Sequence, residues 1–573
     1  MENNCYIKQL SAYCLSNVFQ FFEGKEILKY SSVSHQFFDT SQIDYLWKAL
    51  ATNECVFIQR RKSETWKKAY FRKVLGVMKN MKANYVDPNT GQASFQYEMA
   101  PIRAHSDIIC QVDIFNNLVI SLDNSGLICL SFINYDDPEE VSINKINEFE
   151  GRNVKCFHYD QDSSSLFVID SMLNVALYKL DVDEDQQQCN VDSTLYSRQI
   201  DEVMVPDAGE ENWLTKSIVK IFGKNVIVAP DYRERQSEGI KGTILLIDRT
   251  NGNLTNFISH TNDDMQDLMN VDFESHINPI PIWDYFGTNV HRDSVCYDPR
   301  YDRLLVSDFL CNIDVISTAT GKFVKKLNIK QHRLGEKGEE MLSNLLNETV
   351  FNISLNNSFI YITTNLNIYV LKRYDLQVDA CFEITNIPVK VRMYSVSKAE
   401  RESLKANDNE QFITKLVYGF SDKNSLSWSS FYHVVSQEEQ KDDDGNLVHK
   451  DVSSLMLTSE GSMPKKYENL HINYHWRRRI GLPFQNQVQV TDNIHSVDIN
   501  NSLAVCACGD MKVNVFDMDL GKSIYYLPSG SKFVKSYKEH PQKPGVSEIK
   551  LSEDKICLVL GNIMRVYSFD VEE

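Results

Sequence analysis

The side chains best suited to recognition chemistry in this 573-residue sequence are clustered arginines. They lie in the run HWRRR, in the segment YRERQ and in the pair His291-Arg292; the candidates are Arg233, Arg235, Arg292, Arg477, Arg478 and Arg479. A guanidinium can bind a carboxylate or a phosphate through two parallel hydrogen bonds. These arginines therefore predict a site for an anionic group of a partner. The alternative is that they pair with nearby Asp and Glu residues on the surface.

Sequence motifs of catalysis are absent. The chain has no P-loop, no Gly-rich dinucleotide fingerprint, no HExxH and no GxSxG. His471 and His475 have the spacing of two metal ligands on one helix, but no CxxC accompanies them. Cys506 and Cys508 alternate on an apolar strand, which favours two buried thiols. We therefore expect no catalytic residues, no metal and no cofactor.

The charge balance narrows the class of partner. Lys and Arg number 60 against 78 Asp and Glu, so the net charge is -18. A nucleic-acid binder would carry a basic footprint, so we expect no nucleic-acid partner. The first residues lack the features of a signal peptide, and no apolar stretch approaches the ~18 residues of a membrane span. We expect a protein of the cytoplasm that can also enter the nucleus, without membrane insertion and with its 13 Cys reduced.

From about residue 93 the sequence repeats a pattern of short apolar runs. Each run is followed by a polar turn and a second, partly alternating run. The first runs start 48 to 87 residues apart and cover 118–122, 166–169, 226–228, 304–306, 359–362, 416–420, 503–508 and 556–560. Repeats of four short strands at such spacing predict the blades of a β-propeller. Polar insertions such as 437–445 are expected to be loops.

The ends of several repeats resemble WD repeats. Segments 246–257, 314–327 and 515–527 each contain a strand, a turn with Gly and another strand, and Phe516-Asp517 is the nearest substitute for Trp-Asp. His105 lies where the Gly-His turn of a blade would place its His. We expect eight blades, with seven as the alternative. Residues 94–99 could add a fourth strand to the last blade and close the ring. The innermost strands look apolar, so an enzyme with its site in the channel is the least favoured interpretation.

The N-terminal residues predict a small helical unit. Leu15, Val18, Phe19 and Phe22 fall at i, i+3, i+4 and i+7, which makes one apolar stripe. Further apolar positions follow at Ile27, Leu28, Val33, Phe37, Leu46 and Trp47. About 40 residues form only a marginal core alone. The stripe therefore indicates a partner surface, while a self-buried helical core is the alternative.

Residues 10 to 50 resemble an F-box. The matching features are an initial Leu, the helix LSNVFQFF, the Ile-Leu step, the pattern VS..F and the closing Leu-Trp; Ser11 replaces the usual Pro. The resemblance implies apolar contacts with a Skp-type adaptor. The residues concerned are Leu10, Leu15, Val18, Phe19, Phe22, Ile27, Leu28, Val33, Phe37 and Trp47.

The two resemblances together imply a mainly β protein with a small α N-terminal domain: an F-box (8–50), a helical linker (51–92) and a WD-repeat-like propeller (93–573). Such a chain is similar to the substrate receptors of Skp–cullin–F-box ubiquitin ligases. The adaptor would connect it to a cullin–RING ligase, and the propeller would bind a substrate protein. Binding of a phosphorylated substrate through the clustered arginines is one possibility within this interpretation. A non-catalytic scaffold without ubiquitin transfer is the alternative.

Overall fold

The computed structural model describes residues 11–19, 27, 31–53 and 65–71 of the N-terminal part, and most of 101–568. Within 101–568 the residues not described are 134–140, 150, 153, 162, 171, 184–187, 201–216, 223–224, 231–242, 260–294, 308–311, 321–322, 330–349, 365–366, 384–387, 397–409, 423–424, 442–446, 458–464, 469–485, 490–493, 501, 509–511, 519–521, 529–545, 547 and 553.

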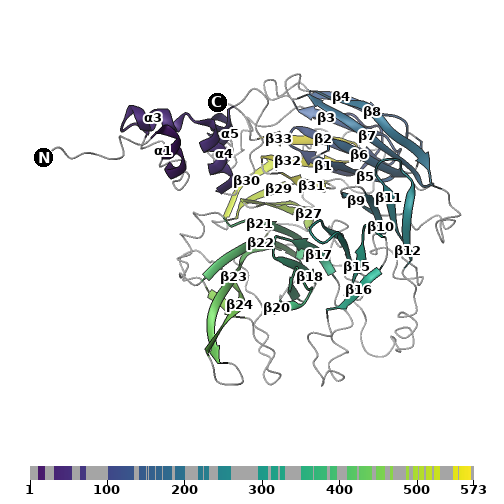
Figure 1. The fold of residues 1–573 in the computed structure, drawn as a ribbon. Coiled ribbons are helices and arrows are strands. Elements are labelled where there is room, and N and C mark those ends of the chain that lie inside the picture. The colour runs from purple at the N-terminus through teal and green to yellow at the C-terminus, as the bar shows by residue number, and fades with distance from the viewer. Residues whose placement is uncertain are drawn as a thin grey trace.

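Eight antiparallel sheets follow one another along the chain (Figure 1). Blade 1 contains β1 (Ile109–Phe115), β2 (Leu118–Asp123), β3 (Ile128–Ile133) and β4 (Val141–Ile146). Blade 2 contains β5 (Val154–Asp160), β6 (Ser165–Asp170), β7 (Asn174–Asp183) and β8 (Gln188–Gln199). Blade 3 contains β9 (Ser217–Phe222), β10 (Asn225–Pro230), β11 (Thr243–Asp248) and β12 (Leu254–Ser259). Blade 4 contains β13 (Val295–Asp298), β14 (Arg303–Ser307), β15 (Asn312–Ser317) and β16 (Phe323–Asn328).

The second half of the chain continues the series. Blade 5 contains β17 (Val350–Leu355), β18 (Phe359–Thr364), β19 (Asn367–Lys372) and β20 (Val378–Glu383). Blade 6 contains β21 (Pro388–Tyr394), β22 (Glu410–Asp422), β23 (Ser425–Lys441), β24 (Leu447–Leu457), β25 (Lys465–Glu468) and β26 (Asn486–Gln489). Blade 7 contains β27 (Ile494–Ile499), β28 (Leu503–Cys508), β29 (Lys512–Asp517) and β30 (Lys522–Pro528). Blade 8 contains β31 (Glu548–Leu551), β32 (Lys555–Leu560) and β33 (Ile563–Ser568).

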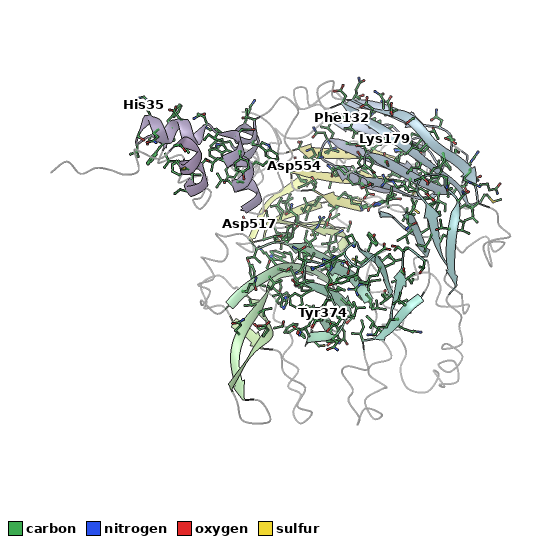
Figure 2. The ribbon with its side chains drawn as sticks, viewed as in Figure 1. His35, Phe132, Lys179, Tyr374, Asp517 and Asp554 are labelled. Atoms are coloured by element: carbon green, nitrogen blue, oxygen red, sulfur yellow. The ribbon has the colours of Figure 1, made fainter. Side chains whose placement is uncertain are left out.

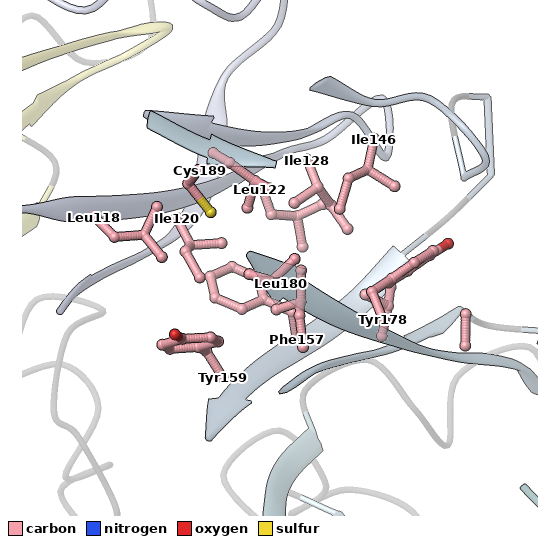
Figure 3. Packing of buried hydrophobic residues seen from close by; sticks show 14 of the residues in the cluster. Leu118, Ile120, Leu122, Ile128, Ile146, Phe157, Tyr159, Tyr178, Leu180 and Cys189 are labelled. Atoms are coloured by element: carbon pink, nitrogen blue, oxygen red, sulfur yellow. The ribbon is translucent and has the colours of Figure 1, made fainter. Parts of the chain in front are cut away.

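Each pair of neighbouring sheets shares one cluster of buried apolar side chains. Between blades 1 and 2, for example, Ile120 and Leu122 pack with Phe157 and Leu180 (Figure 3). A final cluster joins blade 8 to blade 1 through Val559 and Val119, which closes the circle. The chain is an eight-bladed β-propeller. The predicted fold class and the count of eight blades are confirmed.

The predicted apolar runs coincide with the second strand of each blade. Every residue of β2, β6 and β28 is buried, because a second strand has neighbours on both edges and neighbouring blades on both faces. Blade 6 departs from the prediction at residues 437–441. These residues were expected in a loop but continue β23, where they pair with Leu447–Asp451 of β24.

The ring closes where the chain enters it. Ile102 forms an antiparallel bridge with Met564 on β33, through two backbone hydrogen bonds of 2.9 and 3.1 Å. Ile102 therefore occupies the edge of blade 8 at which a fourth strand would pair. Residues 94–99, the segment predicted for that strand, lie outside the described residues.

The N-terminal helices form a unit that lies to one side of the ring (Figure 1). They are α1 (Ala12–Phe19), α3 (His35–Ser41), α4 (Asp44–Asn53) and α5 (Trp66–Phe71). Helix α3 begins after Ser34, whose hydroxyl accepts a hydrogen bond from the Phe37 amide at 3.2 Å as an N-cap. In the part of the chain that the structure describes, no helix has the length and apolar character needed to cross a bilayer.

Candidate functional site

The helical unit buries an aromatic core of its own. Trp47 is fully buried, and its indole Nε1–H donates to the Ser41 carbonyl at 2.7 Å. Its ring lies 5.2 Å from that of Tyr70 and 5.0 Å from that of Phe71. Phe19 and Ile27 belong to the same cluster. The helices therefore satisfy part of their apolar stripe internally, before any partner binds.

The ten predicted adaptor contacts consequently fall into three groups. Leu15, Phe19, Ile27 and Trp47 are buried, and Phe37 is partly buried against the core. Val18 and Val33 are exposed. The remaining three, Leu10, Phe22 and Leu28, lie outside the described residues. The buried side chains can support the shape of the unit, whereas the exposed ones are available to a partner.

An apolar surface remains at the start of α3. Val33 precedes the N-cap Ser34, and Phe38 is the fourth residue of the helix. Side chains at these two positions normally pack on one another as a hydrophobic staple. Here Val33 is 69% exposed and Phe38 51% exposed, so most of the staple faces solvent. The sequence analysis did not single out Phe38; the capping serine four residues before it was the available signal.

Both ring nitrogens of His105 have hydrogen-bond partners inside the protein. Its Nδ1 lies 3.0 Å from Asp123 Oδ2, and its Nε2 lies 2.7 Å from Ser121 Oγ. The side chain is buried, and this burial lowers the pKa of His105 despite the opposing effect of the Asp123 carboxylate. The residue thus ties the entry of the chain to β2 of blade 1, the kind of place that the WD-like pattern predicted.

The six candidate arginines, Arg233, Arg235, Arg292, Arg477, Arg478 and Arg479, lie outside the described residues, as do His471 and His475. Their predicted role stays a prediction. Cys506 and Cys508 are buried with their sulfurs 4.0 Å apart, as expected for core thiols of blade 7.

The innermost strands are more polar than expected. First strands of neighbouring blades contact one another, as β27 and β31 or β31 and β1 do, so these strands border the axis of the ring. On each of them, one residue pairs with a second-strand residue that packs against the following blade. In seven blades this first-strand residue is polar: Asp113, His158, Lys220, Ser354, Arg392, Asp498 and Lys550; in blade 4 it is Cys296. The expectation of apolar innermost strands was wrong at this level of the ring.

Four consecutive members of this polar ring alternate in charge. Arg392 of blade 6 reaches both Asp498 oxygens of blade 7 at 3.1 Å, and Lys550 of blade 8 lies 3.6 Å from Asp113 of blade 1. Lys390 adds a second cation 3.6 Å from Asp498. Burial alone would raise the pKa of the Asp498 carboxyl, but Lys390 and Arg392 hold it well below its ordinary value. Ion pairs therefore link blades 6 and 7 and blades 8 and 1.

Polar side chains of the innermost strands also accept hydrogen bonds from backbone amides of the following blade. Asp498 accepts the Leu551 amide at 2.8 Å, and Ser496 accepts the Ile549 amide at 3.0 Å. Gln111 accepts the Phe157 amide at 3.2 Å across the next blade boundary. An innermost strand has no strand partner on its axial side, and its amides would otherwise depend on water. Asp498 of the polar ring, together with Ser496 and Gln111, thus has a structural role.

A second buried polar network lies between blades 5 and 6. The Tyr361 hydroxyl is 2.9 Å from His433 Nδ1, and His433 Nε2 is 3.0 Å from Ser453 Oγ. Ser453 donates to the Asp379 carboxylate, so its oxygen must accept from the ring. The ring therefore carries a proton on Nε2. Burial lowers the pKa of His433, so the imidazole is neutral and Tyr361 donates to its Nδ1.

We expect His433 to make the stability of the propeller depend on pH. Burial lowers the pKa of His433 from 6.5 to about 4. Between these values the unfolded chain binds more protons than the folded one, so stability falls as pH falls. His433 alone should remove about 2 kcal/mol of unfolding free energy between pH 7 and pH 5. Urea titrations at both pH values should show that the loss of unfolding free energy between pH 7 and pH 5 is about 2 kcal/mol smaller in His433→Gln than in the wild type.

Tyr361→Phe is the matched control for this prediction. It removes the hydrogen bond to Nδ1 but keeps the buried imidazole, so stability should drop at both pH values and the difference between them should persist. An unchanged pH dependence in His433→Gln would contradict the assignment.

Comparisons with known proteins add little to this geometry. No protein-family model matches the chain, and no curated protein matches its sequence. Among solved structures it is similar to Sqt1 of Saccharomyces cerevisiae, at 10% identity and a TM-score of 0.43 over 83% of this chain and 99% of that one. It is also similar to the C-terminal WD40 domain of Sif2 (10%, TM-score 0.42, 82% and 98%) and to a europium-containing methanol dehydrogenase (11%, TM-score 0.41, 84% and 88%). Such scores carry no argument about function, so the proposals below depend on the chain itself.

Proposed function

We propose that the chain is a non-catalytic receptor: its N-terminal helices bind a Skp-type adaptor, and its propeller holds a substrate protein for a cullin–RING ubiquitin ligase. The observation that carries the proposal is the exposed staple of Val33 and Phe38, on a helical unit that resembles an F-box. Among the described residues of the unit, most large apolar side chains are inside its core, so exposed ones at a helix start suggest a docking surface.

The proposed mechanism is proximity. A receptor that binds an adaptor at one end and a substrate at the other raises the local concentration of substrate lysines near a charged ubiquitin-conjugating enzyme. It needs no catalytic groups of its own. The proposed location is the cytoplasm, with the nucleus as an additional location.

The proposal predicts a defined loss of adaptor binding. Val33→Asp combined with Phe38→Asp should weaken capture of the purified adaptor by about 30-fold, because charge replaces the apolar anchors. The variant should still fold, since both side chains are exposed and an acidic residue in the first turn of α3 is compatible with the helix dipole. Pull-down of the adaptor by the full chain measures the effect.

Val324→Asp is the matched control, because Val324 is 62% exposed on β16 of the propeller and should not affect the adaptor. Equal recovery of the adaptor with the double variant and with this control would refute the F-box assignment.

The second candidate function is a propeller scaffold without ubiquitin transfer. The buried helical core favours this function, because apolar side chains of the stripe that pack inside the unit are not available to an adaptor. Co-purification from cells discriminates the two: adaptor together with cullin supports the receptor, and adaptor without cullin supports the scaffold.

A further inference from the structure

The tripeptide Arg-Tyr-Asp occurs at 300–302 and again at 373–375. The first copy lies in the turn between β13 and β14 of blade 4, and the second in the turn between β19 and β20 of blade 5. In a four-stranded antiparallel blade, the first and third turns lie at the same end. Blades 4 and 5 are neighbours with a shared apolar cluster. The two copies therefore stand side by side on one face of the ring.

A buried carboxylate holds the two turns together. Asp298 is fully buried and accepts Arg303 Nε at 3.1 Å and Arg373 Nε at 3.0 Å. Arg303 also donates to the backbone carbonyl of Arg373, across the blade boundary. Burial would raise the pKa of the Asp298 carboxyl, but Arg373 and Arg303 outweigh this and lower it. The ion pairs of Asp298 with Arg303 and Arg373 therefore hold the two turns in a fixed geometry.

Each of the two turns also carries an exposed tyrosine. The Tyr301 ring lies 4.5 Å from the Arg303 guanidinium and is 39% exposed. Tyr374 follows Arg373 directly and is 64% exposed; Figure 2 labels it. Arg300 is exposed, lies 5.8 Å from the Tyr301 ring and donates to the Asn357 carbonyl at 3.4 Å. We call Arg300, Tyr301, Arg303 and Tyr374 the Arg-Tyr patch.

The acidic members of the two tripeptides are engaged locally. Asp302 accepts hydrogen bonds from the Tyr297 hydroxyl at 3.2 Å and from Thr318. Asp375 accepts the Gln377 amide at 3.0 Å within its own turn. The group that the patch offers to an incoming anion is therefore the Arg300 guanidinium, which lies near the exposed Tyr301 ring, while the exposed Tyr374 belongs to the turn of the neighbouring blade.

We propose that the Arg-Tyr patch docks a short segment of a partner protein that carries an anionic group next to an apolar residue. Tyr and Arg are the residues that most often dominate binding energy at protein interfaces. Here the ion pairs with Asp298 fix the base in advance, which reduces the entropy lost on binding. The anion is a carboxylate or a phosphate. The inference deepens the proposed receptor role of the propeller by naming where and by what chemistry a substrate would bind.

A phage-displayed library of random peptides tests the proposal. The full chain and its Tyr301→Ala/Tyr374→Ala variant are immobilised in parallel, and peptides enriched only by the wild type are synthesised with a fluorescent label. These peptides should share Asp or Glu beside an apolar residue. Anisotropy titrations should show about 30-fold weaker binding to the double variant and about tenfold weaker binding to Arg300→Ala. Replacing the acidic residue with phosphoserine identifies the anion: tighter binding supports phosphate, and weaker binding supports carboxylate.

Tyr526→Ala is the matched control, because Tyr526 is 54% exposed on β30 of blade 7 and should leave binding unchanged. Equal melting temperatures check that all the variants fold; Arg300→Ala provides the decisive comparison if the double variant does not. Enriched peptides without an acidic residue, no peptide specific to the wild type, or equal weakening by Tyr526→Ala would overturn the proposal. Peptide binding should persist in the Val33→Asp/Phe38→Asp chain, so failure of the patch and failure of adaptor docking are separate results.

Discussion

An Asp498→Ala variant should lose roughly 3–5 kcal/mol of unfolding free energy, because the substitution removes a fully buried carboxylate from two partly buried cations. Arg392 contacts both oxygens of Asp498, and Lys390 lies near one of them. The carboxylate also accepts the Leu551 amide of the next blade, so the change opens a strand edge as well. Urea unfolding of the full chain, followed by tryptophan fluorescence, measures the loss; Trp428 of blade 6 is buried in the propeller.

Asp113→Ala is the matched control in the same polar ring. Asp113 is partly exposed, and its partner Lys550 keeps Glu548 at 3.1 Å, so the expected loss is about 1 kcal/mol or less. Similar losses for the two variants would contradict the argument from burial.

The contribution of Asp498 also has a defined pH dependence. Its folded pKa lies below the unfolded value, so in that interval the unfolded chain binds more protons. The stabilisation is therefore complete above the unfolded pKa of about 3.9 and is lost as pH falls further. His433 acts at higher pH, between about 6.5 and 4, so the two groups weaken the propeller in successive pH ranges on acidification.

A Trp47→Ala variant should unfold the helical unit and leave the propeller intact. The substitution removes a fully buried indole, which typically costs about 3–5 kcal/mol, and it leaves the Ser41 carbonyl without its indole donor. A unit of this size has little stability to lose. Hydrogen exchange measured by mass spectrometry should show loss of protection in 35–53 and unchanged protection in β2, β6 and β28.

Tyr45→Ala provides the control on the same helix, because Tyr45 is exposed and should leave exchange in 35–53 unchanged. Retained protection in α4 of the Trp47→Ala chain would mean that α4 does not depend on the aromatic core.

The strands could be predicted from the sequence because their burial is two-sided. A run such as LVISL at 118–122 is apolar at nearly every position, and only a strand covered on both faces and both edges requires that. The same criterion failed for the innermost strands. In the sequence, Asp498 and Arg392 alternate with apolar neighbours. That they belong to one polar ring becomes visible only when the pairing of the first and second strands is compared between all the blades. Pairing registers between strands far apart in the sequence cannot be read from one repeat.

The helical unit shows a second limit. An apolar stripe at helical spacing predicts that Phe19 and Val18 face something apolar, but it does not say what. Phe19 faces the core of the unit and Val18 faces solvent. The distinction depends on how α4 and α5 pack, and Trp47 and Tyr70 provide that packing from positions outside the stripe. The Arg-Tyr patch was missed for a different reason: a repeated tripeptide gains meaning only when both copies lie at one end of adjacent blades.

The bridge between Ile102 and Met564 has a consequence for biosynthesis. These residues are separated by about 460 positions, so the ring cannot close until Met564 has left the ribosome. At typical elongation rates, roughly 20 to 90 s pass between the synthesis of Ile102 and that of Met564. The helical unit is synthesised before the propeller and can pack its own core during that time. Blade 1 meanwhile lacks the side chains of blade 8 that cover its Val119 and Cys129. A nascent chain of this design exposes apolar surface for as long as translation lasts, which makes it a natural client for chaperones that bind at the ribosome.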